Sequence, residues 1–424
     1  MPHPGSCVGS APALLIVLLM AASVERTDER AALLEEVDTA MRERYYDPTY
    51  GGMDWGALLN RHRASLLEAA SDEQFYRGLN AMLFELGVSH IGVLPAEHPE
   101  WIGAPSVFSD GDVGLDARII DDEIVITSVR AGSPAERAGV RPGHVIKSID
   151  GATLADLKRE VLHNTPVSLL DRRTLFGLKV LEKFYGPTGD SVAIAYHDAQ
   201  RRRHECTLTR VPRPGRTVFM DGIPPQYLEF ETRRLAGGIG YIRFNAFNPD
   251  LLDRILDAVN GMDDNRGLII DIRGNSGGAF GVRYELARHL VRGPGRCWRY
   301  RYRDRVEDVN VEPVPHAYSG ALAILVDEQS ASSSEELAGA MQAMGRAAIV
   351  GVRTPGIVLV ADVVPLSSGD TFIIPIAQTE TTNGMVLEGR GVIPDIEVTH
   401  DVQTLLDGRD AQLEAALDHL RNPK

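Results

Sequence analysis

A strongly apolar segment that runs into a serine-rich turn and then into a helix-forming segment places the strongest constraint on this fold. Residues 321–329 (ALAILVDEQ) have the hydrophobicity of a strand buried on both faces. Residues 335–345 (EELAGAMQAMG) have helical character. The turn between them, residues 330–334 (SASSS), puts hydroxyl groups at the positive end of a helix. The unpaired backbone N–H groups there can stabilise an oxyanion, so this unit predicts an α/β domain with a candidate nucleophile.

The C-terminal half repeats this alternation of buried strands and amphipathic helices. Apolar runs at residues 238–244, 266–274, 320–328 and 347–352 are separated by helical patterns such as residues 249–262 and 281–291. This alternation predicts a largely parallel or mixed buried sheet surrounded by helices. Residues 410–422 (DAQLEAALDHLRN) are expected to form a closing amphipathic helix.

The N-terminal part has a different sequence pattern, which is helical. Residues 27–86 show helical periodicity in three stretches and contain little Gly or Pro outside the segment 47–52. We expect three packed helices, with Asp54 as one N-cap and Ser71 or Asp72 as another.

Residues 107–211 read instead as short strands with glycine turns. Two strands, a short capped helix and a third strand are predicted, the helix beginning at the capping box Ser133–Pro134–Ala135–Glu136. Residues 190–211 should add a closing hairpin.

Length, charge and the N-terminal apolar run limit the cellular role. A chain of 424 residues should contain two to four domains. Its net charge of −15 argues against a nucleic-acid or acidic-lipid partner. Residues 11–22 (APALLIVLLMAA) are too few to span a bilayer and resemble the core of an export signal. We therefore expect an exported protein, periplasmic or extracellular, whose mature chain has no integral membrane span.

A second glycine-rich turn supplies a candidate oxyanion site. Residues 267–278 (GLIIDIRGNSGG) form a predicted buried strand that ends in a turn where glycines let backbone N–H groups converge. Gly277 and Gly278 are the expected oxyanion wall, although a plain tight turn would have the same sequence. The alternative that Ser276 is a chymotrypsin-like nucleophile is disfavoured, because Asn275 stands where that family has aspartate and the strand–helix alternation does not suit two antiparallel barrels.

The middle region resembles a PDZ domain of bacterial processing proteases, on the strength of the strands and turns of residues 113–151 and the closing hairpin. The resemblance implies capture of an extended peptide or chain terminus, with the backbone near Gly114 and Leu115 meeting a carboxylate. A PDZ-shaped spacer without ligand binding is the alternative.

The order of DIRGNSGG, a buried strand, SASSSE and a helix resembles the C-terminal processing and tricorn-core family of serine peptidases. The resemblance implies a multi-domain α/β protein with an N-terminal helical bundle, a PDZ-like β-rich domain and a ClpP/crotonase-like catalytic domain. In the family pattern the middle serine of S-A-S-x-S-E is the nucleophile, which corresponds to Ser332. The N–H of Ser333 would then be the second oxyanion donor. Taken alone, the same serines also fit a helix cap, and Ser330 or Ser334 is a rival nucleophile.

The general base distinguishes two branches of this family. One branch uses a Ser–Lys dyad, but Ile357 occupies the lysine position here and no lysine lies between Lys183 and Lys424. The tricorn-like branch uses histidine, and residues 84–94 supply the pair Ser89 and His90. The resemblance assigns His90 as general base, with Ser89 and Glu388 completing the site.

The expected domains are a signal peptide at 1–25, the bundle with the Ser-His motif at 26–101, the PDZ-like domain at 104–212, the peptidase domain at 217–400 and a C-terminal helix at 401–424. The expected activity is that of a serine endopeptidase acting on unfolded or tail-marked polypeptides, without a cofactor or metal. A homo-oligomer is compatible with the resemblance. The rival from another class is an inactive member of the same fold that binds peptides or hydrophobic ligands.

Overall fold

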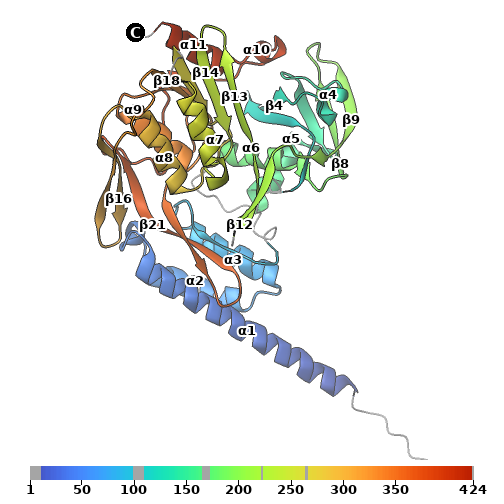
Figure 1. The fold of residues 1–424 in the computed structure, drawn as a ribbon. Helices are drawn as coiled ribbons and strands as arrows, with labels where there is room; N and C mark the ends of the chain where they lie inside the picture. Colours follow the sequence, from blue (N-terminus) through green and yellow to red (C-terminus); the bar gives the residue numbers. More distant parts are fainter. Residues whose placement is uncertain (1–10, 99–108, 165–171, 221–222, 263–265, 423–424) are drawn as a thin grey trace, which may run out of the picture.

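The computed structural model describes residues 11–98, 109–164, 172–220, 223–262 and 266–422. Figure 1 shows three parts: helices at the N-terminal end, a small β-rich domain built from the middle of the chain, and a larger α/β domain from its C-terminal half. Of the segment expected to be a signal peptide, residues 1–10 lie outside the described residues, and residues 11–25 belong to the first helix. No helix in the described ranges is long and apolar enough to cross a membrane.

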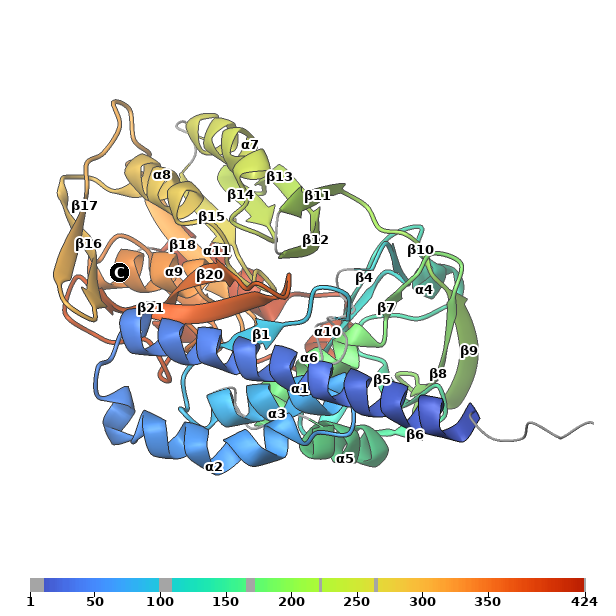
Figure 2. The same ribbon diagram turned by 90° about the horizontal axis from the view of Figure 1, so that it is seen from below.

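The three predicted N-terminal helices are present, with a short 3-10 turn between the first two. They are α1 (Ala11–Arg44), η1 (Tyr50–Gly52), α2 (Trp55–Leu67) and α3 (Asp72–Phe84). Asp54 caps α2 and Ser71 caps α3, as predicted, by accepting hydrogen bonds from the N–H groups of Ala57 and Gln74. Figure 2 shows the helices side by side. A shared core that includes buried Trp55 holds them together.

The middle domain is an antiparallel sheet flanked by helices. Its strands run in the order β3-β4-β5-β8-β9, with β6 beside β5, and a second sheet has the order β10-β2-β7. The elements are β2 (Gly111–Asp112), β3 (Leu115–Ile120), β4 (Glu123–Val129), α4 (Pro134–Arg137), β5 (Val145–Ile149), β6 (Ala152–Thr153), α5 (Leu154–Asn164), α6 (Arg172–Glu182), β7 (Tyr185–Gly186), β8 (Ser191–His197), β9 (Arg203–Thr209) and β10 (Val211–Pro212). The predicted series of two strands, a capped helix and a third strand is confirmed as β3, β4, α4 and β5.

The α/β domain is built on a six-stranded sheet of order β13-β14-β15-β18-β19-β22. All neighbours from β14 to β22 pair in parallel, as the alternating pattern predicts, and β13 is an antiparallel edge strand. The elements are β11 (Arg216–Met220), β12 (Ile223–Leu228), β13 (Phe230–Leu235), β14 (Ile239–Phe244), α7 (Pro249–Asn260), β15 (Gly267–Asp271), α8 (Phe280–Leu290), β18 (Ala321–Val326), α9 (Ser333–Ala343), β19 (Ala348–Gly351), β22 (Ile396–Glu397), α10 (Val402–Leu406) and α11 (Ala411–Arg421).

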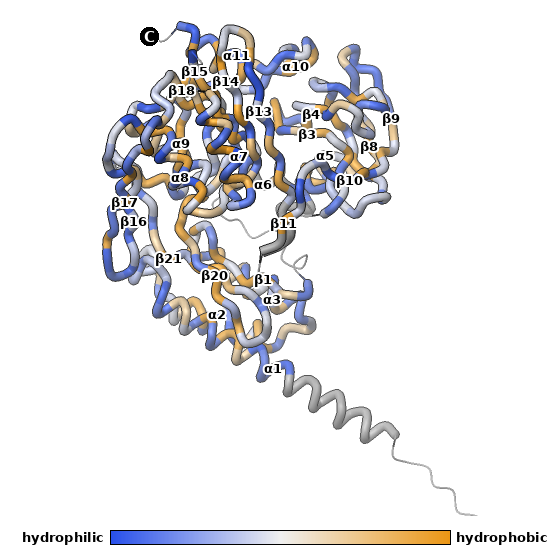
Figure 3. The backbone as a smooth tube through the Cα atoms, viewed as in Figure 1, coloured by the Kyte–Doolittle hydropathy of each residue, from blue (hydrophilic) through white to orange (hydrophobic). Residues whose placement is uncertain are grey.

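Helices cover both faces of this sheet. Residues of α7, α8 and α9 pack on one face, where Ile242 and Ile270 are buried. Residues of α11 pack on the other face, where Tyr241 and Ile269 are buried. The strands are therefore apolar on both sides, which the orange colour of β14, β15 and β18 in Figure 3 makes visible.

A second sheet, not predicted from the sequence, connects the N-terminal helices to the α/β domain. Its strands are β1 (Gly92–Leu94), β16 (Gly295–Tyr302), β17 (Val306–Val311), β20 (Val360–Pro365) and β21 (Thr371–Thr381). In Figure 1, β21 runs from the α/β domain down to the helices. Gly92 pairs with Ile373 of β21, which brings the segment just after His90 onto the α/β domain. The side chain of Asn80 on α3 also bonds the Val93 N–H and C=O, at 2.8 and 2.9 Å.

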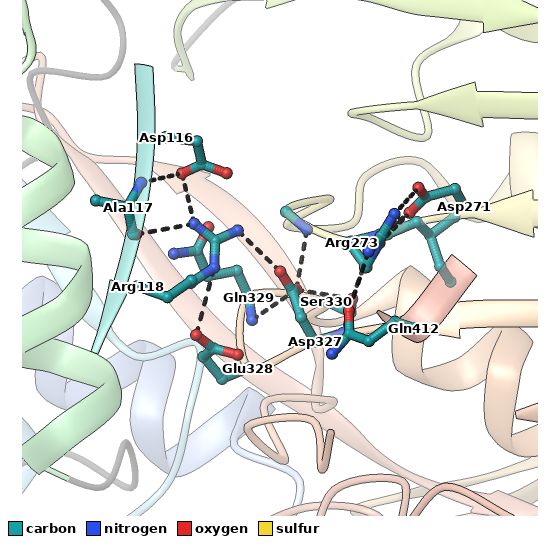
Figure 4. A network of polar contacts seen from close by, with 12 residues as sticks. Asp116, Ala117, Arg118, Asp271, Arg273, Asp327, Glu328, Gln329, Ser330 and Gln412 are labelled. Carbon is teal, nitrogen blue, oxygen red and sulfur yellow. Dashed lines mark hydrogen bonds and ion pairs between the residues drawn. The ribbon is translucent and has the colours of Figure 1, made fainter. Parts of the chain in front are cut away.

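The middle domain is docked onto the α/β domain by a buried arginine and an apolar contact. Arg118 projects from β3 and pairs with Asp327, at 2.9 Å between Nη2 and Oδ2, just after β18 (Figure 4). Ile120 packs with Leu405 of α10. Burial alone would raise the pKa of Asp327, but Arg118 and the Gly274 N–H hold that pKa below its usual range.

Removing this arginine should destabilise the protein. In Arg118→Met, Asp327 is left as a buried carboxylate without its cation, so we expect a loss of about 3 kcal/mol in the free energy of unfolding. Urea denaturation measures this loss. The control is Arg299→Met, which breaks the exposed pair with Asp308 and should cost less than about 1 kcal/mol. Equal stability of the two variants would contradict a structural role for Arg118.

Candidate active site

Ser332 lies at the junction that the sequence singled out, as the N-cap residue of α9. Its backbone has φ of +54° and ψ of −119°, a conformation that side-chain-bearing residues rarely adopt. The strain, on the order of 1–3 kcal/mol, persists because neighbouring hydrogen bonds fix the backbone. Ser332 N donates to Ile357 O at 2.8 Å, and Ala331 N donates to Asn275 O at 3.0 Å. The side chain of Ser332 is half-buried.

The glycine turn after β15 lies directly against this serine. A Cβ on Gly277 would lie 2.7 Å from the Ser332 Cβ and 2.9 Å from the Ser333 N, so only glycine fits. A Cβ on Gly278 would lie 2.4 Å from Phe247 O. Gly278 is exposed, whereas Ser333 is buried as the first residue of α9. The structure thus brings Gly277, Gly278 and Ser333 together around Ser332.

The neighbouring serines have other contacts. The Ser330 hydroxyl is fully buried and donates to Ile272 O at 2.8 Å. The Ser334 hydroxyl is also fully buried and donates to Asn275 O at 2.8 Å. Both hydroxyl groups are therefore committed to backbone carbonyls. Ser276 is exposed on the outside of the glycine turn.

Glu335 organises the segment in front of Ser332. Its fully buried carboxylate accepts hydrogen bonds from Thr354 Oγ1 at 2.5 Å, Gly356 N at 2.7 Å, Ile357 N at 2.8 Å and Ser332 N at 3.2 Å. Burial raises the pKa of Glu335 to about 7 even though these donors favour the ionised form. Ile357 occupies the position at which Ser–Lys peptidases have their lysine. The hydrogen bonds from the backbone N–H groups of Gly356 and Ile357 to Glu335 hold this position in place.

Ser89, His90 and Glu388 form one hydrogen-bonded chain. The Ser89 hydroxyl is 2.8 Å from His90 Nδ1 and donates to Glu388 Oε2 at 3.0 Å. Ser89 N donates to Glu388 Oε1 at 2.8 Å. An ionised carboxylate can only accept, so the single Ser89 proton goes to Glu388 and Nδ1 of His90 is the donor to Ser89. This assignment leaves the lone pair of His90 Nε2 available for a proton.

The hydrogen-bonded series of His90, Ser89 and Glu388 is connected to Ser332 through the backbone of residues 357–358. Val358 N donates to Glu388 Oε2 at 2.9 Å, and the preceding carbonyl, Ile357 O, accepts from Ser332 N. Within the described ranges no hydrogen bond joins His90 directly to Ser332. Such contacts are often long in the absence of substrate and tighten in the complex.

Desolvation shifts the pKa values of His90 and Glu388. Desolvation lowers the pKa of His90 to about 4, so its imidazole is neutral at neutral pH. Desolvation also raises the pKa of Glu388, against hydrogen bonds from Val358 and Ser89 that favour the carboxylate. His90 has a φ of +55°, so both His90 and Ser332 adopt rare backbone conformations.

The expected peptide-binding turn of the middle domain lies at the start of β3. Gly114 has a φ of +73°, and a Cβ there would lie 2.2 Å from the Ser133 Cβ. The same Cβ would be 3.1 Å from Nη2 of Arg130, so a guanidinium borders the turn. Leu115 follows as the first residue of β3, which the strand order places at an edge of the sheet.

Sequence reasoning missed two contributors to the site. The backbone N–H of Val358 supports Glu388, but no side-chain pattern signals a main-chain donor. The buried ion pair of Arg283 and Glu336 behind Ser333 was also missed. The one sequence signal for this pair is that both charged residues stand among apolar residues of predicted helices. Among the described residues, no group of three or more His, Cys, Asp or Glu side chains could hold a metal ion.

Comparisons with known proteins agree with this architecture. The sequence model of peptidase family S41 matches residues 238–398, that of the PDZ domain matches residues 125–169, and that of the tricorn protease C1 domain matches residues 26–84. The PDZ match starts in β4 and covers part of the middle domain.

Whole-chain relatives point the same way. The chain is 27% identical to the chloroplastic carboxyl-terminal-processing peptidase 3 of Arabidopsis thaliana, over 92% of this chain and 73% of that protein. It is 26% identical to the carboxyl-terminal-processing protease of Synechocystis sp., over 93% and 87% of the two chains. The fold resembles the photosystem II D1 C-terminal processing protease, with a TM-score of 0.57, 24% identity and coverage of 93% of this chain and 98% of that chain. The chain therefore contains tricorn C1, PDZ and peptidase S41 domains, is a serine peptidase, and resembles carboxyl-terminal-processing proteases over most of its length.

Proposed function

We propose that this chain is an endopeptidase that cleaves unfolded or tail-marked polypeptides, with Ser332 as nucleophile and His90 as general base. The observation that carries the proposal is the hydrogen-bonded chain from Glu388 through Ser89 to Nδ1 of His90. A serine beside a glycine turn and a helix N-terminus is common in proteins. A neutral histidine oriented by a hydroxyl and a carboxylate has the roles that general-base catalysis requires.

In the proposed reaction, His90 Nε2 accepts the Ser332 proton as the hydroxyl oxygen attacks the substrate carbonyl. The N–H groups of Gly278 and Ser333, with Gly277 lining the wall, stabilise the tetrahedral oxyanion. The imidazolium passes its proton to the departing amine, which leaves an acyl ester on Ser332. Water then attacks this ester with His90 again as base, and the imidazolium returns the proton to the Ser332 oxygen as the ester bond breaks and the acid product leaves.

Glu388 and Ser89 act on the histidine and not on the substrate. The carboxylate keeps the Ser89 hydroxyl oriented, so Ser89 can accept from Nδ1 and hold the tautomer in which Nε2 is free. Once the imidazolium forms, the negative charge of Glu388 stabilises it across the Ser89 hydroxyl. No metal or organic cofactor enters this scheme.

The middle domain is proposed to bring chain termini to this site. An extended peptide can add to β3, an edge strand of its sheet, with its terminal carboxylate at the turn of Gly114 and Leu115. The guanidinium of Arg130 beside that turn supports a negatively charged ligand, although it also pairs with Asp112 at 2.8 Å. We also propose export from the cytoplasm, on the strength of the apolar segment 11–22.

Labelling with a fluorophosphonate probe tests the nucleophile and the base. Ser332→Ala should abolish labelling and hydrolysis of an unfolded protein, whereas His90→Ala should slow both by about 10²–10⁴-fold. The matched control is Ser276→Ala, an exposed serine in the adjacent turn, which should label normally. Labelling that persists in Ser332→Ala rejects the assignment, and a wild-type protein that neither labels nor cleaves favours the inactive binding protein.

The pH dependence of labelling tests the environment of His90. Because burial lowers the His90 pKa to about 4, the neutral base should persist well below pH 6.5. The labelling rate should therefore stay high from pH 7 to pH 5 and fall only as the pH approaches 4. Far-UV circular dichroism checks that the protein is still folded. A rate that is halved near pH 6.5 would show that His90 is solvated like an ordinary histidine.

Peptide termini test the middle domain. A tethered substrate with a free C-terminal carboxylate should have a KM about tenfold lower than the same peptide with a C-terminal amide, because the amide loses the charge recognised at the turn. The kcat values should agree within about twofold, since the scissile bond is unchanged. Equal KM values for the two peptides would exclude terminal carboxylate capture.

A further inference from the structure

The Ser333 side chain connects the two backbone segments that surround Ser332. Its hydroxyl donates to Gly278 O at 2.8 Å and accepts from Arg283 Nη1 at 3.3 Å. Ser333 is buried, so these contacts are not exchanged with solvent. The Ser333 hydroxyl therefore links Gly278 to the first turn of α9, as the Ser334 hydroxyl does for Asn275 at the start of the same glycine turn.

The peptide groups on both sides of Gly278 are anchored. Phe247 N donates to Gly277 O at 2.8 Å, and in a trans peptide this fixes the opposite direction of the Gly278 N–H. On the other side, Ala279 N donates to Phe247 O at 2.7 Å, while Ser333 holds Gly278 O. The Ser333 hydroxyl is thus the side-chain anchor of the Gly278 carbonyl, while Asn275 Oδ1 accepts from the Gly277 N–H at 2.9 Å on the other side of the turn.

Arg283 is held in place from several directions. It lies on α8 with 2% of its side chain exposed and forms an ion pair with Glu336 on α9. It donates to the Tyr300 hydroxyl on β16, and its guanidinium stacks over the Trp298 ring at 4.6 Å. These partners come from rigid elements, so the position of Nη1 next to Ser333 is well defined.

Glu336 is equally constrained. Its carboxylate accepts from Thr379 Oγ1 of β21 at 2.7 Å, and its backbone carbonyl accepts from Trp298 Nε1 at 2.9 Å. Taking two charges out of water is costly, and buried ion pairs are often replaced by apolar side chains without loss of stability. Stability alone therefore gives a weak reason for this pair directly behind the catalytic turn.

We propose that Arg283, held by Glu336, is a positioning residue that keeps the oxyanion site in shape by orienting the Ser333 hydroxyl against Gly278. The inference rests on the proposed function, because it presumes that Gly278 and Ser333 supply the oxyanion donors. Neither charged side chain touches substrate. Their contribution is the alignment of two N–H groups that come from separate elements, which must agree within a few tenths of an ångström for strong hydrogen bonds.

A comparison of substrate and transition-state-analogue affinity tests the proposal. A peptide aldehyde forms a tetrahedral oxyanion with the nucleophile, whereas the matching peptide substrate in its ground state does not. Ser333→Ala should lower kcat and weaken aldehyde binding by about tenfold each, with KM within about twofold. Complete loss of an oxyanion donor would cost about 10²–10³-fold in kcat, so misalignment should cost less.

A paired substitution separates positioning from stability. Arg283→Met combined with Glu336→Gln removes both charges together, which avoids an unpaired buried ion and should preserve folding. It should reproduce the Ser333→Ala losses in kcat and aldehyde affinity. Adding Ser333→Ala to this pair should cause no further loss, because all three changes act through one hydroxyl.

The control is Arg346→Met, another buried arginine of the same domain, which donates to Tyr318 O at 2.8 Å and has no contact with the glycine turn. It should lower the Tm and leave kcat and aldehyde affinity unchanged. Wild-type aldehyde affinity in Ser333→Ala, additive losses in the triple variant, or equal losses in Arg346→Met would overturn the proposal. Hydrolysis that survives Ser332→Ala would instead reject the proposed function itself.

Discussion

Two carboxylates fix the position of the backbone segment 354–358, and the candidate site depends on them. Glu335 accepts from the backbone N–H groups of Gly356 and Ile357, and Glu388 accepts from that of Val358. Since the Ile357 side chain offers no functional group, this residue contributes to the site through its main chain alone, whereas Thr354 also contributes its hydroxyl. The Ile357 carbonyl anchors Ser332, so the same few atoms connect the strained serine to the histidine side of the site.

This arrangement explains how a rare backbone conformation survives at Ser332. A φ of +54° is unfavourable for serine, but the hydrogen bond to Ile357 O and the close approach of Gly277 hold the residue in this conformation. The burial that makes these hydrogen bonds strong also shifts the pKa values of His90 and Glu335. At Glu335, which is fully buried, the geometry of the hydrogen bonds and the raised pKa therefore have the same origin.

Much of the fold could be predicted because its signals are local. The parallel sheet follows from continuous apolar runs between helices, and the caps at Asp54 and Ser71 follow from residue type. The approach of Ser89 to Glu388 could be expected only through family resemblance, since 299 positions separate them. The β1–β21 pairing, the docking of Arg118 and the charges behind Ser333 were not predicted. Each depends on long-range pairing between segments whose own patterns are unremarkable.

One strand, β21, contacts both the N-terminal helical part and the α/β domain that carries the candidate site. It pairs with β1 beside the histidine segment, pairs with β16, contributes Thr379 to Glu336 and lies shortly before Glu388 in the chain. A two-residue slip in its register would displace all of these contacts at once. Proteolytic competence should consequently be gained or lost as a whole with this one register, because the histidine segment and the carboxylate behind Ser333 share the strand.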